Sequence, residues 1–448
     1  MQWRCGLVLL CSIAATAGLG AETPEQRGYR LLTTKAFLPP DFDQQVFDQL
    51  WQCWEEPLRS QAASATPDER RQMAFARYGL TPSPDRDTPV AWQYVDDGRG
   101  GWVMNCLACH GGMVAGRAIA GLPNSLYDLQ TLTEDVRSTK LRLKKRLSHM
   151  DRGSLGMPLS GSIGTTNAVM FGKLLLHYRD ADLNVRRDRL PPTMTHHDHD
   201  APPWWHLKRK THLYIDGFAP KTHRALMQFL LIPKNGPQQF RSWEDDYRDI
   251  LAWMQSLEAP AWPWQIDAPL AEQGQVAFNR VCAACHGTYG PAGQYPEKMV
   301  PLETVGTDPV RHAALDVEGR KAYGHSWFAE GATVPTIEAP AGYVAPPLDG
   351  VWASAPYLHN GSVPTLWHVL HPAERPIVWR RTADGYDQDK VGLEVTTFDS
   401  LPPDVPAGSP RRHYFNTQLS GKSAAGHAFP DELSETEKRA VLEYLKTL

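Results

Sequence analysis

Two Cys-x-x-Cys-His pentapeptides constrain this chain more than any other feature of its sequence. They occupy residues 106–110 and 282–286, and a glycine follows each of them. This spacing is typical of covalent c-type haem attachment: the two thiols add to the two vinyl groups of one haem, and the adjacent histidine ligates the iron. The predicted attachment residues are Cys106, Cys109, Cys282 and Cys285, and the predicted proximal iron ligands are His110 and His286.

A single pentapeptide of this kind also fits a thiol redox pair or half of a zinc site. A thioredoxin-like pair requires a strand-to-helix setting, and a tetrahedral zinc site requires two further ligands nearby. Here the motif occurs twice and uses four of the seven cysteines. The repetition favours two covalently bound c-type haems as the cofactors.

The N-terminal residues 1–21 predict a cleaved export signal. Arg4 provides a positive start, residues 6–17 are small or apolar and uncharged, and small residues precede Glu22. The apolar run is shorter than the ~20 residues that a membrane span needs. We therefore expect a periplasmic or secreted protein without a membrane span in the mature chain. Cys5 and Cys11 would leave with the signal, and Cys53 would remain as a small buried side chain.

The rest of the sequence predicts a mainly α fold of two cytochrome c-type haem domains with long irregular loops. Each half shows a haem motif, a long variable insert and then an amphipathic helix, which is the order found in cytochrome c domains. The first such helix spans 242–257 with Ser242 as its N-cap, and the second follows Ser434. The predicted domains are 22–262 and 263–448. A net charge of −4 without a basic stripe excludes nucleic acid as a partner.

Three polar segments lie outside the motifs. A helix predicted over 126–147 carries a run of basic residues, including Lys140, that we interpret as a solvated face. Residues 189–203 form a loop rich in His and Asp, which fits a metal site or, more simply, a solvated loop. The aromatic pair Trp204-Trp205 and the basic residues after it fit a haem pocket whose propionates need cations, or a packed surface loop.

Between the second motif and the chain's last helix, residues 342–366 read GYVAPPLDGVWASAPYLHNGSVPTL. This segment closely resembles the signature loop of the bacterial di-haem cytochrome c peroxidase superfamily. Its Leu-His-Asn-Gly-Ser form, the Trp204-Trp205 pair and Gly426-His427 look most like the rubber oxygenase-like branch. The chain is shorter than the rubber-cleaving enzymes, so the resemblance does not extend to their polymer substrate.

The resemblance implies a division of labour between the two haems. For the second haem the candidate distal ligands are His427, His359, His371 and methionines, and the rubber oxygenase-like branch implies His427. His359 has an alternative role in hydrogen bonds within its own loop, and Tyr357 and His359 are also candidate catalytic or pocket residues. For the first haem, Met104 and Met113 are too close to the motif to reach the opposite side of the iron. An open position is what substrate binding requires, and in the family the haem of the N-terminal half is the reacting one.

The leading hypothesis is therefore a periplasmic di-haem oxidoreductase that reduces peroxide or activates dioxygen at the first haem. The C-terminal haem would relay electrons from a small redox protein, an organic co-substrate could take part, and Trp204 and Trp205 would serve as pocket or relay aromatics. One alternative is an electron-transfer cytochrome whose haems are both saturated. Another is a haem-bearing module of a larger complex.

Overall fold

The computed structural model describes residues 21–448, with only the backbone described at 383–384. The predicted signal at 1–21 lies outside the described residues except for its last position. Within them, no helix combines the length and the apolar character needed to cross a bilayer.

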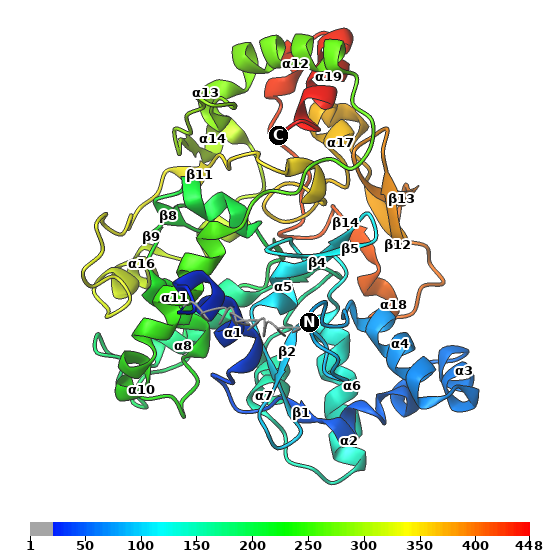
Figure 1. Ribbon diagram of the computed structural model, residues 1–448, viewed down its shortest axis with the longest axis vertical. Helices are drawn as coiled ribbons and strands as arrows, with labels where there is room; N and C mark the ends of the chain where they lie inside the picture. The colour runs from blue at the N-terminus through cyan, green and yellow to red at the C-terminus, as the bar shows by residue number, and fades with distance from the viewer. Residues whose placement is uncertain (1–20) are drawn as a thin grey trace, which may run out of the picture.

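The expectation of a mainly α fold is wrong. About 40% of the chain is helical and 13% lies in strands, which form several small two- and three-stranded sheets (Figure 1). The sequence analysis missed them because most are two to four residues long, too short for a readable alternation of apolar and polar residues. The architecture also does not by itself show two haem domains.

The helices of eight or more residues are α1 (Pro24–Thr34), α4 (Pro67–Tyr78), α6 (Leu129–Arg142), α7 (His149–Gly156), α8 (Ala168–His177), α11 (Glu244–Ser256), α12 (Ala268–Val281), α16 (Val317–Gly324) and α19 (Glu435–Leu445). The strands are β1 (Phe42–Asp43), β2 (Tyr94–Asp96), β3 (Gly101–Met104), β4 (Gly111–Val114), β5 (Arg117–Ala120), β6 (Thr165–Thr166), β7 (His199–Asp200), β8 (His212–Leu213), β9 (Ala219–Pro220), β10 (Met299–Pro301), β11 (Gly342–Val344), β12 (Val378–Asp387), β13 (Gly392–Phe398) and β14 (Tyr414–Asn416). All strand pairs are antiparallel, and the larger sheets have the orders β1-β3-β2 and β13-β12-β14.

Two helix pairs repeat the same close crossing. Helix α1 packs on α11, and α12 packs on α19 at the top of the view in Figure 1. In each pair a glycine makes the contact: a Cβ on Gly28 would lie 2.1 Å from the carbonyl oxygen of Asp249, and one on Gly274 would lie 1.9 Å from that of Ala440. Only a residue without a Cβ lets two helix backbones approach this closely.

The helix starts follow capping chemistry, with one correction. Helix α19 follows Ser434, as predicted, and begins at a capping box between Ser434 and Glu437. The predicted cap at Ser242 is wrong because Ser242 ends the short helix α10 (Pro237–Ser242). Helix α11 follows Trp243, whose indole makes no capping hydrogen bond.

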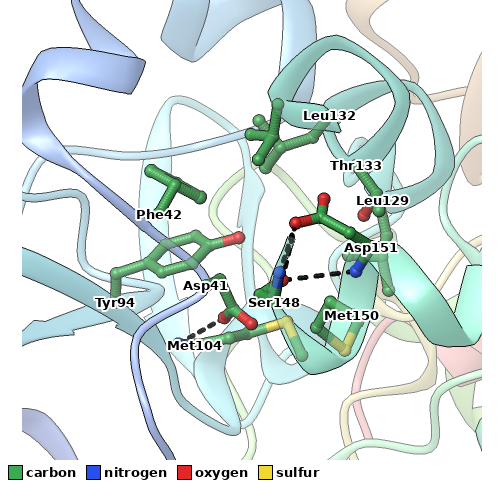
Figure 2. Close-up of a pocket in the computed structure, with 11 residues that line it drawn as sticks. Asp41, Phe42, Tyr94, Met104, Leu129, Leu132, Thr133, Ser148, Met150 and Asp151 are labelled. Atoms are coloured by element: carbon green, nitrogen blue, oxygen red, sulfur yellow. Dashed lines mark hydrogen bonds between the residues drawn. The ribbon is translucent and has the colours of Figure 1, made fainter. Parts of the chain in front are cut away.

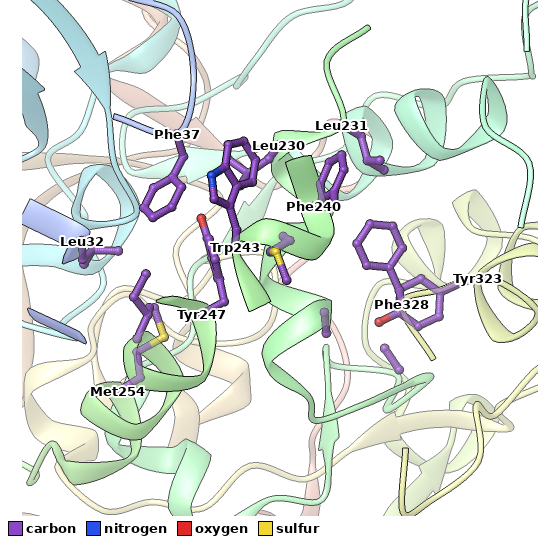
Figure 3. Packing of buried hydrophobic residues seen from close by; sticks show 14 of the residues in the cluster. Leu32, Phe37, Leu230, Leu231, Phe240, Trp243, Tyr247, Met254, Tyr323 and Phe328 are labelled. Carbon is purple, nitrogen blue, oxygen red and sulfur yellow. The ribbon is translucent and has the colours of Figure 1, made fainter. Parts of the chain in front are cut away.

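One hydrophobic core joins both halves of the sequence. Leu32, Phe37 and the α11 residues Tyr247 and Met254 pack in the same cluster as Tyr323 and Phe328 (Figure 3). The segment 314–329 therefore packs into the core of the N-terminal half, although it belongs to the predicted second domain. The predicted domain boundary at 262/263 stays a prediction, and one buried apolar cluster contains residues from both sides of it.

The basic run at the end of α6 is not wholly a solvated face. Lys140 is buried, with its ammonium group paired to the Asp151 carboxylate and bonded to the backbone carbonyl of Asp41. Asp41, Asp151 and Ser148 are polar side chains around a small pocket whose other walls are mostly apolar (Figure 2). A buried ammonium persists only when it is paired and hydrogen-bonded, which is the arrangement here.

Candidate functional site

The first motif lies between two small sheets. Strand β3 leads directly into Cys106, the short helix α5 (Leu107–His110) carries the rest of the motif, and the β4–β5 hairpin follows. The two thiols are unpaired and half-buried, and burial raises the pKa of Cys106 to about 11 and that of Cys109 to about 12. Two neutral thiols with two residues between them, within about one helical turn, can add to the two vinyl groups of a haem.

His110 is held in place by an indole. Its ring stacks on Trp204 with centroids 4.6 Å apart and planes 25° apart, and Trp204 in turn packs edge-on against Trp253 of α11. Burial lowers the pKa of His110 to about 4, partly offset by the Pro202 carbonyl. The imidazole is therefore neutral at pH 7, as an iron ligand must be.

The second motif follows helix α12, whereas the first follows a strand. Its short helix α13 (Ala283–His286) ends at His286, whose Nδ1 donates to the carbonyl of Pro346 at 2.8 Å. This bond leaves Nε2 as the nitrogen with a free lone pair, because the hydrogen bond on one ring nitrogen sets which nitrogen can ligate. Tyr289 reinforces the turn by donating to the carbonyl of His286 at 3.0 Å.

His427 faces His286. The ring centroids are 6.1 Å apart with planes at 64°, and burial lowers the pKa of His427 to about 3. The backbone reaches this position through Gly426, where a Cβ would lie 2.2 Å from the carbonyl carbon of Gly306, and the amide of His427 donates to Val305 at 2.6 Å. His427 itself adopts a positive φ of 50°, a strained conformation for a residue with a Cβ.

The two rings fit a shared haem iron. Metal–imidazole nitrogen bonds are ~2.0 Å long, so two opposed imidazoles on one metal have centroids about 6 Å apart, as found for His286 and His427. Nδ1 of His427 is buried without a hydrogen bond among the described residues. The donor set at the second motif therefore fits a haem held by Cys282, Cys285, His286 and His427.

The segment Trp204-Trp205-His206 connects the two motifs. Trp205 is fully buried, and both its Nε1 and the Nε2 of His206 lie within hydrogen-bond distance of the Asp349 carbonyl, at 2.6 and 2.9 Å. Asp349 follows Pro346, the acceptor for His286, by three residues. Two neighbouring residues of one short helix thus reach both motifs: Trp204 contacts His110, and Trp205 bonds to the loop that holds His286.

The basic residues after this segment lie at the second motif. Arg209 forms an ion pair with Asp349 at 2.9 Å, and its guanidinium lies 5.3 Å from the Tyr289 ring centroid. Burial lowers the pKa of Lys210, which Glu297 and Asp216 partly offset. Lys208 is exposed, whereas Arg209 and Lys210 are partly buried and can neutralise haem propionates, so the two predicted alternatives both stay open.

The loop at 189–203 is not simply solvated. His197, Asp198 and His199 are buried, and Asp198 pairs with Lys422 at 2.7 Å. Burial lowers the pKa of His197 to about 4 and that of His199 well below its ordinary value. Within residues 21–448, no group of three or more His, Cys, Asp or Glu side chains is arranged to hold a metal ion.

Tyr357 and His359 occupy the loop that carries the family resemblance. The Tyr357 hydroxyl donates to the Val351 carbonyl at 3.1 Å, which is a bond within the loop. The His359 ring lies 4.5 Å from that of Tyr343, and its carbonyl accepts from Asp200 at 3.0 Å. The structure brings neither residue into contact with the ring of His286, whereas His427 does contact it.

One segment of the chain, next to the second motif in space, matches a known protein family. Residues 342–380 match the RoxA-like, cytochrome c-like family. This RoxA-like segment contains Pro346, which accepts from His286, and Arg375, which donates to the carbonyls of Ala424 and Gly426 at 2.6 Å. It therefore positions the histidine on each side of the second site, and a cytochrome c-like domain implies a haem cofactor.

Two curated relatives extend the comparison. The chain is 30% identical over 204 residues to the uncharacterized protein y4iM of Sinorhizobium fredii strain NBRC 101917 / NGR234, covering 40% of this chain and 45% of the relative. It is 29% identical over 259 residues to the uncharacterized protein y4iJ of the same strain, covering 43% and 41%. The chain thus spans less than half the length of either relative.

Sequence reasoning missed the two residues that position the second pair of histidines. Pro346 lies in a recognisable Pro-Pro dipeptide, but its carbonyl carries no side-chain signal. Arg375 is a single arginine before a proline, and only the fold places it beside residues 424–427.

Proposed function

We propose that this protein is an exported di-haem c-type oxidoreductase that reduces peroxide or activates dioxygen at the first motif. The second motif holds a haem that relays electrons from a small redox protein. The observation that carries the proposal is the asymmetry between the motifs: His286 faces His427 at 6.1 Å, whereas His110 stacks on Trp204 and packs against no second histidine ring among the described residues.

The residues divide the work as follows. When bound, haem supplies an iron that binds small oxidants and changes its redox state. His110 offers the iron one neutral nitrogen, and Trp204 fixes the plane of that ring. His286 and His427 would both hold an iron at the second site, which would leave small molecules no open position there. Trp204 and Trp205, adjacent in the chain, lie between the two sites, with Trp204 on His110 and Trp205 bonded to the Asp349 carbonyl.

Titration of the reduced holoprotein with carbon monoxide tests this asymmetry. We expect saturation at one carbon monoxide per chain, together with peroxide-dependent oxidation of a reduced small cytochrome. His110→Gly should abolish that oxidation, whereas His359→Gly, a change to a histidine outside the motifs, should retain most of it.

Two other results would change the proposal. No carbon monoxide binding under any redox condition would favour the pure electron carrier. Two molecules per chain would show that His427 does not saturate the second iron. Export is tested separately by fractionating cells and sequencing the N-terminus of the purified chain, where an intact Met1 or a cytoplasmic location would contradict it.

A further inference from the structure

A buried pair of tyrosines lies beside the first motif and has no part in the roles assigned so far. Tyr94 of β2 and Tyr127 are 2% and 3% exposed, and their hydroxyl oxygens are 3.0 Å apart. The Tyr127 hydroxyl also donates to Sδ of Met104 at 3.3 Å. Tyr94 of β2 pairs directly with Met104 of β3, and Met104 lies two residues before Cys106.

The pair packs against the attachment cysteine of the first motif. Asn124 links them, since its amide donates to the Cys109 carbonyl at 2.9 Å and its own carbonyl accepts from the Tyr127 amide at 3.1 Å. Tyr94, Tyr127 and Cys109 belong to one packed cluster. Burial raises the pKa of both hydroxyls, and Cys109 adds to the rise. A haem bonded to Cys109 would thus be attached at a residue that packs in the same cluster as the two phenols.

A buried carboxyl lies on the other side of the pair. Tyr94 and Asp41 line the same small cavity, and the Tyr94 hydroxyl points into it (Figure 2). The cavity measures about 10 Å³, which is about the space that one water molecule needs. The Asp41 Oδ2 accepts from the Met104 amide at 3.1 Å, but Oδ1 is buried without a hydrogen bond to any described residue.

The carboxyl has a route to solvent. The His149 Nε2 lies 3.6 Å from Oδ1 of Asp41, and the His149 side chain is 19% exposed. Burial raises the pKa of Asp41, partly offset by His149, so this carboxylate accepts a proton more readily than an ordinary aspartate. Phenol, cavity, carboxylate and imidazole therefore form an ordered series from the motif to the surface.

We propose that Tyr94 and Tyr127 form a redox-active site that gives one electron to the haem of the first motif and one proton to Asp41. The inference rests on the proposed function, with hydrogen peroxide as the oxidant. Hydrogen peroxide takes up two electrons, together with two protons from the solvent, as its O–O bond breaks, giving two waters. One electron comes from the second haem and the other from a phenol, whose O–H bond breaks to leave a neutral phenoxyl radical.

The phenolic proton is handed on through the pair and the cavity to Oδ1 of Asp41. The phenoxyl radical regains its electron from the small redox protein and its proton from Asp41, so the site returns to its starting state. The tyrosine pair would thus store one oxidising equivalent away from the open position of the first haem, after the second haem has given its electron.

Tyr247 offers a matched control. Its side chain is 2% exposed, and burial together with electrostatic interaction with Cys106 raises the pKa of its hydroxyl. Cys106 is the other attachment cysteine of the same motif. Among the described residues, however, no hydrogen-bond partner pairs with its hydroxyl. A phenol at a similar place without a proton acceptor should not form a neutral radical, because the oxidised phenol must lose its proton.

The test is freeze-quench electron paramagnetic resonance of the holoprotein mixed with hydrogen peroxide. We expect a tyrosyl signal that narrows when the protein is grown on ring-deuterated tyrosine. Tyr94→Phe, Tyr127→Phe and Asp41→Asn should each reduce the signal at least fivefold, and Tyr247→Phe should leave it unchanged. Haem content and the absorption spectrum of each variant show whether it has folded, and 3-fluorotyrosine incorporation, which shifts the hyperfine pattern, replaces any variant that does not fold.

The outcomes separate this inference from the proposed function. If peroxide changes the haem absorption spectrum but no tyrosyl signal appears, or if Tyr247→Phe removes it, the tyrosine site is wrong and the proposed function stands. If peroxide leaves the haem spectrum unchanged, the proposed function fails and the inference falls with it. A signal that survives the double variant Tyr94→Phe/Tyr127→Phe would also overturn the assignment.

Discussion

The imidazole rings of His286 and His427 face one another with their centroids 6.1 Å apart, although 140 residues lie between them in the sequence. Pro346 fixes the first ring through a 2.8 Å hydrogen bond, and Arg375 fixes the backbone before the second through 2.6 Å bonds to Ala424 and Gly426. Both of these residues belong to the RoxA-like segment. One short segment thus positions two histidines from distant parts of the chain.

Replacing His427 with glycine should convert the second haem from low to high spin without detaching it. The thioether bonds come from the cysteines, and only the sixth ligand is lost. The absorption spectrum and electron paramagnetic resonance of the oxidised protein measure the change. His359→Gly is the control and should leave the low-spin signal intact, because its ring lies on Tyr343. The reverse pattern would show that His359 is the ligand.

The mature chain should carry the mass of two haems. Intact-mass spectrometry of the denatured protein checks this, because thioether bonds survive denaturation. The double variant Cys106→Ala/Cys109→Ala should lose one haem, since no thiol remains at the first motif. Cys53→Ala should lose none, because Cys53 contacts Thr139 at 3.3 Å and lies in neither motif. A wild-type excess of a single haem would contradict the assignment of one motif.

Asp216 should make the stability of the protein sensitive to acid. Burial raises its pKa, but the Arg311 and Arg320 guanidinium groups, at 3.2 and 2.9 Å, outweigh burial and hold the pKa below its ordinary value. A depressed pKa stabilises the fold above the unfolded value of ~3.9. That stability is lost as the pH falls through the lower folded value, so urea midpoints should drop below about pH 5.

Asp216→Asn removes that dependence and leaves two buried guanidinium groups unpaired. Breaking a buried ion pair typically costs about 3–5 kcal/mol in the free energy of unfolding. Urea denaturation at pH 7 measures it. Asp188→Asn breaks an ion pair with Arg186 that is exposed on both sides and should leave the unfolding free energy nearly unchanged. Equal losses of unfolding free energy in the two variants would show that the buried cluster around Asp216 stabilises the fold no more than an exposed ion pair does.

Gly274→Ala should destabilise the protein through the α12–α19 crossing. The added methyl would lie 1.9 Å from the Ala440 carbonyl oxygen, so the helices must separate. Overpacking of this kind costs about 1–3 kcal/mol. Thermal and urea unfolding measure the loss. Gly156→Ala is the matched control: it also lies in a helix, α7, and its Cβ would meet nothing within 4 Å, so unfolding should change little.

The sequence by itself identified the chemistry that local spacing encodes. Cys-x-x-Cys-His brings two thiols and one imidazole together within about one helical turn, so its function can be inferred without the fold. The boundaries of α12 and α19 were also predictable, because apolar periodicity and capping residues are local signals. The short strands were missed for the same reason, since two or three residues carry no period.

Only the tertiary structure decided which distant groups meet. The stacking of Trp204 on His110 and the burial of Lys140 against Asp151 join residues whose types carry no mark of their partner. His427 was one of several candidates for the second haem, and the structure places its ring opposite that of His286. The hydrogen-bond acceptors at Pro346 and Asp349 are backbone carbonyls, which every residue possesses. Such contacts depend on how helices and loops pack, and packing depends on the whole buried surface rather than on any local pattern.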